Sequence, residues 1–173
     1  NPGKINFGWA GLGVVAGAWL SQLTGITVTF VPYKGTGPVV NDLIAGRLDV
    51  RTANMIIAMP LIKARKLVPL AMLGDKTALL PDVPTVQEQG FPEFNFSPWI
   101  GYFAPPGTPP AIVSKLSQNF AKTINSPELV KELTTQGSRP VGLSPDEFKQ
   151  QLATEMARWR QLAKETGLKL EGE

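Results

Sequence analysis

Three short segments of the sequence carry residue types that could bind a ligand. The first is a glycine-rich loop, Gly8-Trp9-Ala10-Gly11-Leu12-Gly13, which follows an apolar stretch and precedes a helical pattern. Glycines at such a junction let backbone N–H groups turn toward an anion at the start of a helix. The spacing is not that of a dinucleotide fingerprint, and the loop lacks the Gly-Lys-Ser/Thr ending of a phosphate loop. An anion-binding loop and a tight packing turn both fit these glycines.

The second and third segments also end predicted strands. Val31-Pro32-Tyr33-Lys34-Gly35 offers the ring and hydroxyl of Tyr33, while Lys34 is either an anion contact or an ordinary exposed lysine. In Arg51-Thr52-Ala53-Asn54, the last side chain provides both a donor and an acceptor. Because the carboxyl ends of parallel strands meet at one edge of a sheet, a ligand is expected there. The residues predicted to line this edge are Gly11, Gly13, Tyr33, Gly35 and Asn54.

The residue types needed for catalysis are scarce. The 173 residues include no His and no Cys. Ser-His-Asp and Cys-His catalysis, and imidazole or thiolate metal sites, are therefore excluded within this sequence. Asp42 and Asp49 lie on or near a predicted short helix, and we expect them to be solvated or paired instead of forming an acid–base dyad. We predict a binding protein, not an enzyme, with no catalytic residue, cofactor or metal.

The positive charge is concentrated in the first part of the chain. Residues 1–80 carry a net charge of +5, and residues 81–173 carry −2. A solvated basic face and a surface that attracts an anion are both compatible with this distribution. The sequence contains no Lys/Arg run, so nucleic acid is the weaker interpretation.

The elements that must position these segments alternate along the first hundred residues. Apolar runs predict strands over 4–8, 28–32, 49–52 and 68–73, and helical patterns end near 23 and cover 38–45 and 59–66. This alternation predicts a parallel or mixed sheet flanked by helices. A short helix is expected over 85–89 and a strand over 99–104.

Three helices are predicted in the last third of the chain. Thr108-Pro109, Ser126-Pro127 and Ser144-Pro145 each place a capping hydroxyl before a proline suited to the first turn. Ser144 and Glu147 have the spacing of a capping box, and Gly167 is expected to end the last helix.

Five sequence blocks stand in order and together resemble one family. They are Asn1-Pro2-Gly3-Lys4, Val31-Pro32-Tyr33-Lys34-Gly35, Asp42-Leu43-Ile44-Ala45-Gly46, Leu80-Pro81-Asp82-Val83-Pro84-Thr85-Val86 and Phe103-Ala104-Pro105-Pro106-Gly107-Thr108-Pro109. The sequence resembles the solute receptors of tripartite tricarboxylate transporters, the Bug or TctC receptors, as far as about Gly167. This resemblance implies an α/β type II periplasmic-binding-protein fold. Residues 1–98 would form one complete ligand-binding lobe, and residues 99–173 a hinge strand and C-terminal helices returning to the other lobe, whose N-terminal part would be absent.

The resemblance also implies a function and a site. A periplasmic receptor of this kind captures a small mono- or dicarboxylate and delivers it to membrane permease subunits, without nucleic acid. The positions that match the family's ligand loops are Gly8, Trp9, Ala10, Gly11, Leu12, Gly13, Pro32, Tyr33, Lys34, Gly35, Ala53 and Asn54. Ala53 stands where many relatives have an aspartate, and Trp9 and Leu12 replace small polar residues. We therefore expect a carboxylate with an aliphatic or aromatic body.

Two alternative functions and one consequence of truncation stay open at this point. The chain could serve as a ligand-sensing receptor for a signalling partner. It could also be the effector domain of a LysR-type transcription regulator, which would need a helix-turn-helix that the sequence does not supply. Because the apolar stripes of the last helices would lack a covering lobe, a domain-swapped or symmetric homo-oligomer with weak anion affinity is expected.

Overall fold

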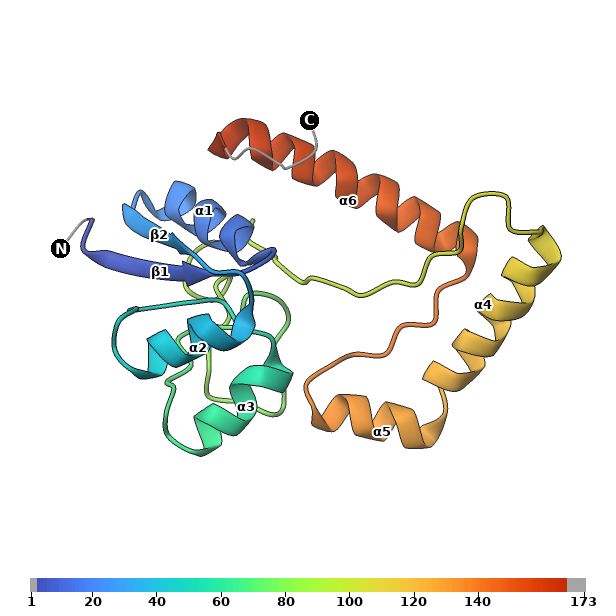
Figure 1. Cartoon of the computed structure of the whole chain (residues 1–173), viewed down its shortest axis with the longest axis horizontal. Helices are drawn as coiled ribbons and strands as arrows, with labels where there is room; N and C mark the ends of the chain where they lie inside the picture. The colour runs from blue at the N-terminus through green and yellow to red at the C-terminus, as the bar shows by residue number, and fades with distance from the viewer. Residues whose placement is uncertain (1–2, 168–173) are drawn as a thin grey trace. The chain divides into compact units, whose positions relative to one another are not determined.

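The computed structural model describes residues 3–167, which form two compact units (Figure 1). The first unit runs as far as Phe96 and takes up the chain again at Gln161, and the second spans Ser97–Arg160. The predicted division into residues 1–98 and 99–173 refers to the two lobes of a complete receptor, and it stays a prediction.

The first unit is built on a parallel pair of strands. β1 (Ile5–Trp9) and β2 (Val28–Pro32) pair with Phe7 opposite Phe30, and α1 (Gly13–Thr24) connects them. A parallel pair needs such a crossover, because its strands run in the same direction. These three elements lie within a few residues of the ranges predicted from the sequence.

Helices cover both faces of this strand pair (Figure 1). On one face, Gly17 of α1 lies against the rings of Phe7 and Phe30, whose centroids are 5.5 Å apart. On the other face, Gly8 lies against Val39 of α2 (Thr36–Ile44). Successive strand residues point to opposite faces, which explains why Phe7 and Gly8 meet different helices.

The predicted third strand, 49–52, is reduced to a single bridge. Val50 pairs in parallel with Phe7, so β1 lies between β2 and Val50. The carboxylate of Asp49 accepts the N–H of Asn6 at 2.7 Å, the donor that a ladder extended back to Leu48 would use. The expected strand is therefore wrong in length, although its position beside β1 is right.

The predicted fourth strand, 68–73, and the predicted helix, 85–89, are also wrong. Only Met72 pairs, in a parallel bridge with Thr85. Pro69 has no N–H for a ladder, and Val68 is 79% exposed, so the segment before Met72 does not form a ladder. Thr85 and Glu88 do exchange the bonds of a capping box, at 2.8 and 3.0 Å, but the chain forms only turns before Gly90.

α3 (Met55–Lys63) begins four residues earlier than predicted. The carbonyl of Asn54 accepts the N–H groups of Ile57 and Ala58, both at 3.0 Å, and starts the helix. Pro60 lies inside the helix instead of opening it. The helix ends at Lys63, and Arg65 in the turn that follows has a left-handed φ of 56°.

The second unit contains the predicted C-terminal helices. These are α4 (Pro110–Ile124), α5 (Pro127–Thr135) and most of α6 (Pro145–Thr166), which continues into the first unit. The capping box is confirmed: Glu147 accepts the N–H of Ser144 at 2.8 Å, and the Ser144 hydroxyl accepts the N–H of Glu147 at 3.3 Å. Ser126 also caps its helix, whereas the Thr108 hydroxyl donates to the carbonyl of Pro105 and caps nothing.

The predicted strand over 99–104 is irregular in the structure. Its aromatic residues pack on helices instead: Tyr102 stacks on Phe120 with centroids 4.8 Å apart, and Trp99 meets Phe148 at 5.1 Å. Several apolar side chains of this unit remain exposed, among them Ile100 at 94%. The homo-oligomer expected from these apolar stripes stays a prediction, which sedimentation of the chain would test.

Candidate functional site

Three loops of the first unit meet at the carboxyl edge of the sheet. The N–H of Tyr33 donates to the carbonyl of Trp9 at 3.0 Å, which joins the first two loops. The Arg51 Nη1 donates to the carbonyl of Thr36 at 3.4 Å, which joins the third loop to the second. A Cβ on Gly13 would lie 2.8 Å from the Thr52 hydroxyl, so the first and third loops are also neighbours. We call residues 10–13, 33–36 and 51–54 together the loop edge.

The glycines of the first loop have different roles. Gly8 is buried inside β1, its N–H donates to the carbonyl of Val50 at 3.0 Å, and a Cβ there would collide with Leu48 and Val39. Gly11 has a φ of +56° and faces open space. Gly8 is therefore a packing glycine, as in the tight-turn alternative, whereas Gly11 lies in an open turn.

The open turn leaves backbone donors and apolar surface available. In the described part of the chain, the N–H groups of Gly11 and Leu12 have no protein acceptor, whereas that of Gly13 bonds the carbonyl of Ala10 at 3.3 Å. The Leu12 side chain is 62% exposed, and Trp9 is half-buried. Two free amides next to apolar side chains suit an anion that carries a hydrocarbon body.

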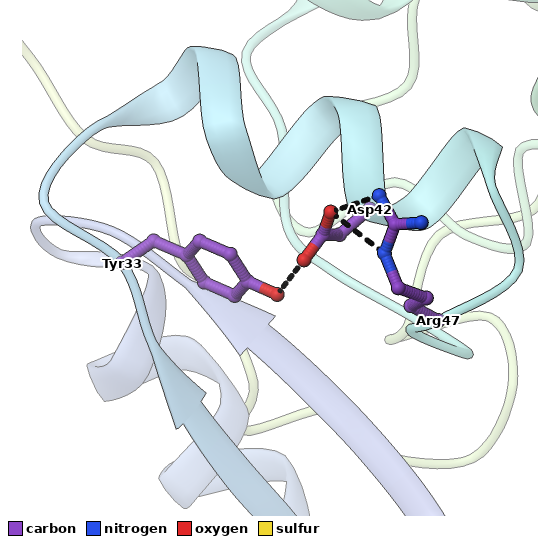
Figure 2. Close-up of polar contacts among 3 residues, drawn as sticks. All are labelled: Tyr33, Asp42 and Arg47. Carbon is purple, nitrogen blue, oxygen red and sulfur yellow. Dashed lines mark hydrogen bonds and ion pairs between the residues drawn. The ribbon is translucent and has the colours of Figure 1, made fainter.

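Tyr33 in the second loop is held by a polar cluster with α2 (Figure 2). Its hydroxyl donates to Asp42 Oδ2 at 2.6 Å, and Arg47 donates to Asp42 Oδ1 from Nε at 3.0 Å and Nη2 at 2.6 Å. Asp42 is thus paired, as predicted. The single proton of Tyr33 is committed to Asp42, so the residue offers a ligand its ring and its oxygen lone pair.

The electrostatics of this cluster are those of an ionised carboxylate held by two donors. The Arg47 guanidinium, and then the Tyr33 hydroxyl, keep the pKa of Asp42 below its ordinary range. The hydrogen bond to Asp42 is the main reason that the pKa of Tyr33 is raised. Asp42 remains charged and Tyr33 remains protonated across the physiological pH range.

We expect Asp42→Asn to lower the melting temperature at neutral pH, and to do so less in acid. A carboxyl whose pKa falls on folding stabilises the fold above its unfolded pKa, and this contribution is lost as the pH falls through the folded pKa. Thermal unfolding from about pH 3 to pH 7 should therefore show the two proteins converging at the acid end. The exposed Asp82→Asn is the matched control and should give no such convergence. A constant difference between the Asp42 variant and the unmodified chain would contradict the pairing.

The other predicted positions lie exposed or half-buried at the same edge. Lys34 is exposed, and no carboxylate among residues 3–167 pairs with it. Asn54 is exposed, and its side-chain amide bonds no described residue. Its backbone carbonyl, not its side chain, accepts the first hydrogen bonds of α3. Ala53 is exposed beside it, and Pro32 ends β2.

Arg51 is a residue of this edge that the sequence did not single out. Its Nε donates to the carbonyl of Thr52 at 2.7 Å, in addition to the Nη1 bond to Thr36. Partial burial lowers the pKa of its guanidinium. The one available sequence signal is a basic side chain directly after a predicted strand, at the edge where ligands of α/β sheets bind.

The described residues form neither a metal-binding cluster nor a membrane-spanning helix. No group of three or more His, Cys, Asp or Glu residues among them could hold a metal ion. Asp49, the remaining acid near β1, accepts the N–H of Asn6. Within residues 3–167, no helix is both long enough and apolar enough to cross a bilayer.

A separate hollow of about 750 Å³ lies in the second unit, between α4 and the start of α6. It is lined by side chains such as Val113, Ser117 and Glu147, and no lysine or arginine contributes to it. Glu147 is already bonded to Ser144 in the capping box. An anion therefore has no charged partner in this hollow.

Comparisons with known proteins identify relatives over nearly the whole chain. The family model described as "Tripartite tricarboxylate transporter family receptor" matches residues 1–168. Protein BugT of Bordetella pertussis is 38% identical over 173 residues, which cover 98% of this chain and 53% of BugT. A protein from the clcB-clcD intergenic region of Pseudomonas knackmussii is 32% identical over 158 residues, covering 88% of this chain and 94% of that protein. The chain thus spans about half the length of BugT.

Solved structures of similar proteins share the fold. R. palustris Rpa4515, solved with adipate, superposes with a TM-score of 0.90 at 32% identity, over 96% of this chain and 57% of that one. The periplasmic binding protein BugD superposes with a TM-score of 0.88 at 26% identity, over 98% of this chain and 58% of BugD. MatC of Rhodopseudomonas palustris, solved with malate, superposes with a TM-score of 0.82 at 28% identity, over 92% of this chain and 57% of MatC. The predicted fold class, an α/β periplasmic-binding-protein fold present in part, is confirmed.

Proposed function

Because this chain belongs to the tripartite tricarboxylate transporter receptor family, we propose that it binds a small organic carboxylate for delivery to membrane permease subunits. The family consists of solute-binding receptors and is not an enzyme family. We further propose that the chain works in the periplasm and that binding involves no catalysis. The adipate in Rpa4515 and the malate in MatC support a carboxylate as the class of ligand.

The observation that carries the proposal is the convergence of free donors at the loop edge. Two loop amides, at Gly11 and Leu12, have no protein acceptor among residues 3–167, and the Asn54 side chain of the third loop bonds no described residue. A carboxylate accepts up to about four hydrogen bonds, so it is the kind of ligand that such a set of donors satisfies. The ligand contacts that we propose come from Trp9, Ala10, Gly11, Leu12, Gly13, Pro32, Tyr33, Lys34, Gly35, Ala53 and Asn54, with Gly8 in support.

The apolar residues at the same edge favour a ligand with a hydrocarbon body. Leu12 and Ala53 are exposed, and burying them against a ligand would contribute about 25 cal/mol per Å². Of the acidic side chains that the structure describes, none stands free at the loop edge to pair with an ammonium group, because Asp42 is bonded to Tyr33 and Arg47. We propose that amino acids bind less tightly than unsubstituted carboxylates.

Calorimetric titration of the purified chain tests this function. The ligands are straight-chain dicarboxylates that include adipate, together with malate, benzoate and aspartate, and the neutral adipamide is the matched control. We expect heat of binding from adipate or benzoate, a weaker response to aspartate and none to adipamide. Tight binding of aspartate without binding of the apolar acids would contradict the proposal that the ligand has a hydrocarbon body. The absence of binding by any acid would overturn the function.

A further inference from the structure

Arg51 occupies a fixed position where the three loops meet. It follows Val50, the residue that bridges to Phe7 of β1, and so it enters the loop edge directly from the sheet. Its Nε donates to the carbonyl of Thr52 at 2.7 Å, and its Nη1 donates to the carbonyl of Thr36 at 3.4 Å. These two bonds hold the guanidinium between the second and third loops.

The charge of this guanidinium has no counter-charge among the described residues. Both acceptors are neutral carbonyls, and a guanidinium carries five N–H donors, so three of them bond no residue that the structure describes. Within residues 3–167, no carboxylate forms an ion pair with Arg51. Asp42 is taken by Arg47 and Tyr33, and Asp49 accepts the N–H of Asn6.

The free end of Arg51 reaches solvent. No buried side-chain nitrogen or oxygen among the described residues lacks a hydrogen-bond partner, so Nη2, which has none, is accessible. The rest of the side chain is half-buried, and this desolvation lowers its pKa. An arginine in this state binds a carboxylate more strongly than a fully hydrated one does, because part of its desolvation has already occurred on folding.

We propose that Arg51 binds a carboxylate of the ligand through Nη2, and that this contact makes the loop edge select anionic over neutral solutes. The planar fork of a guanidinium matches the two oxygens of a carboxylate, which a point charge such as lysine does not. This assignment rests on the proposed function, since it needs a carboxylate at the loop edge.

Calorimetric titration of four proteins with adipate and with malate tests the assignment. They are the unmodified chain, Arg51→Gln, Arg51→Lys and the matched control Arg65→Gln, which removes the same charge from an exposed turn of the same unit. We expect Arg51→Gln to weaken binding of the acid by about 10- to 100-fold, the usual effect of losing a hydrogen bond to a charged group. Arg51→Lys should recover part of the loss, and Arg65→Gln should bind as the unmodified chain does.

A second measurement keeps the assignment testable if the Arg51 variants fold poorly. In the unmodified chain with ¹⁵N-labelled arginine, the Nε signal of Arg51 should shift on addition of adipate or malate, whereas that of Arg65 should not. Adipamide should leave both signals unchanged.

The outcomes separate the two claims. If the unmodified chain and Arg51→Gln bind the acid equally tightly, or if the Arg51 signal does not move while the acid binds, the Arg51 assignment is wrong and the proposed function stands. If the unmodified chain binds neither acid nor any other in the series, the proposed function fails and the Arg51 assignment falls with it.

Discussion

Phe94→Ala is expected to lower the free energy of unfolding by about 3–5 kcal/mol, the usual cost of removing a buried aromatic ring. Phe94 has no exposed surface, and its ring lies 4.5 Å from that of Trp19 in α1. Deletion of the ring leaves a cavity next to a residue that is itself nearly buried. Chemical denaturation followed by circular dichroism measures the change.

The matched control for this substitution is Phe103→Ala. Phe103 is 67% exposed, so its removal opens no cavity and should cost little. A loss below about 1 kcal/mol for Phe94→Ala, similar to that of the control, would contradict the placement of Phe94 in the core of the first unit.

Gly8→Ala is expected to cost about 1–3 kcal/mol and to weaken carboxylate binding as well. A methyl group at this position meets Leu48 and Val39, both of which are buried. Because Val39 belongs to α2, we expect relief of the collision to displace that helix as well as Leu48, and the first turn of α2 follows Tyr33 and Gly35. A packing change inside β1 therefore reaches the loop edge.

Gly37→Ala controls for the loss of a glycine. A Cβ at Gly37 meets nothing within 4 Å, and this residue lies in the first turn of α2. Alanine there should leave stability unchanged or raise it by about 0.4–1 kcal/mol through the unfolded state. Equal stabilities for the two variants in denaturant unfolding would show that the close approach of Gly8 to α2 is wrong.

Local chemistry made part of the fold predictable from the sequence. The parallel pair Ile5–Trp9 and Val28–Pro32 follows from apolar runs separated by a helical pattern, and the capping box follows from Ser144 and Glu147 alone. Such signals depend on residues that are close in the chain, so no knowledge of the tertiary structure is needed.

The predicted strands that proved wrong are those that need a pairing partner from a distant part of the chain. The apolar run over 68–73 has the composition of a strand, but only Met72 finds a partner. At 49–52, only Val50 bridges to β1, and the Asp49 side chain also bonds the backbone of β1. Both outcomes depend on contacts between distant segments.

The candidate site could likewise be predicted from the sequence only in part. The three loops were predicted because each follows an apolar run, and the rule that carboxyl ends of parallel strands meet brought them together. The partners of individual side chains were beyond this reasoning. The Tyr33 hydroxyl is committed to Asp42, and no described carboxylate pairs with Arg51. Both facts depend on side-chain directions that only the three-dimensional structure gives.

The measurement that tests the central claim most directly is a map of backbone amide shifts on titration of the ¹⁵N-labelled chain with adipate. If the loop edge binds carboxylates, the largest shifts will fall on residues 10–13, 33–36 and 51–54. Gly11 and Leu12 should be prominent because their N–H groups bond no acceptor among residues 3–167. Adipamide should leave these signals in place. Shifts that cluster instead around the hollow between α4 and α6, or an unchanged spectrum at saturating adipate, would contradict the account.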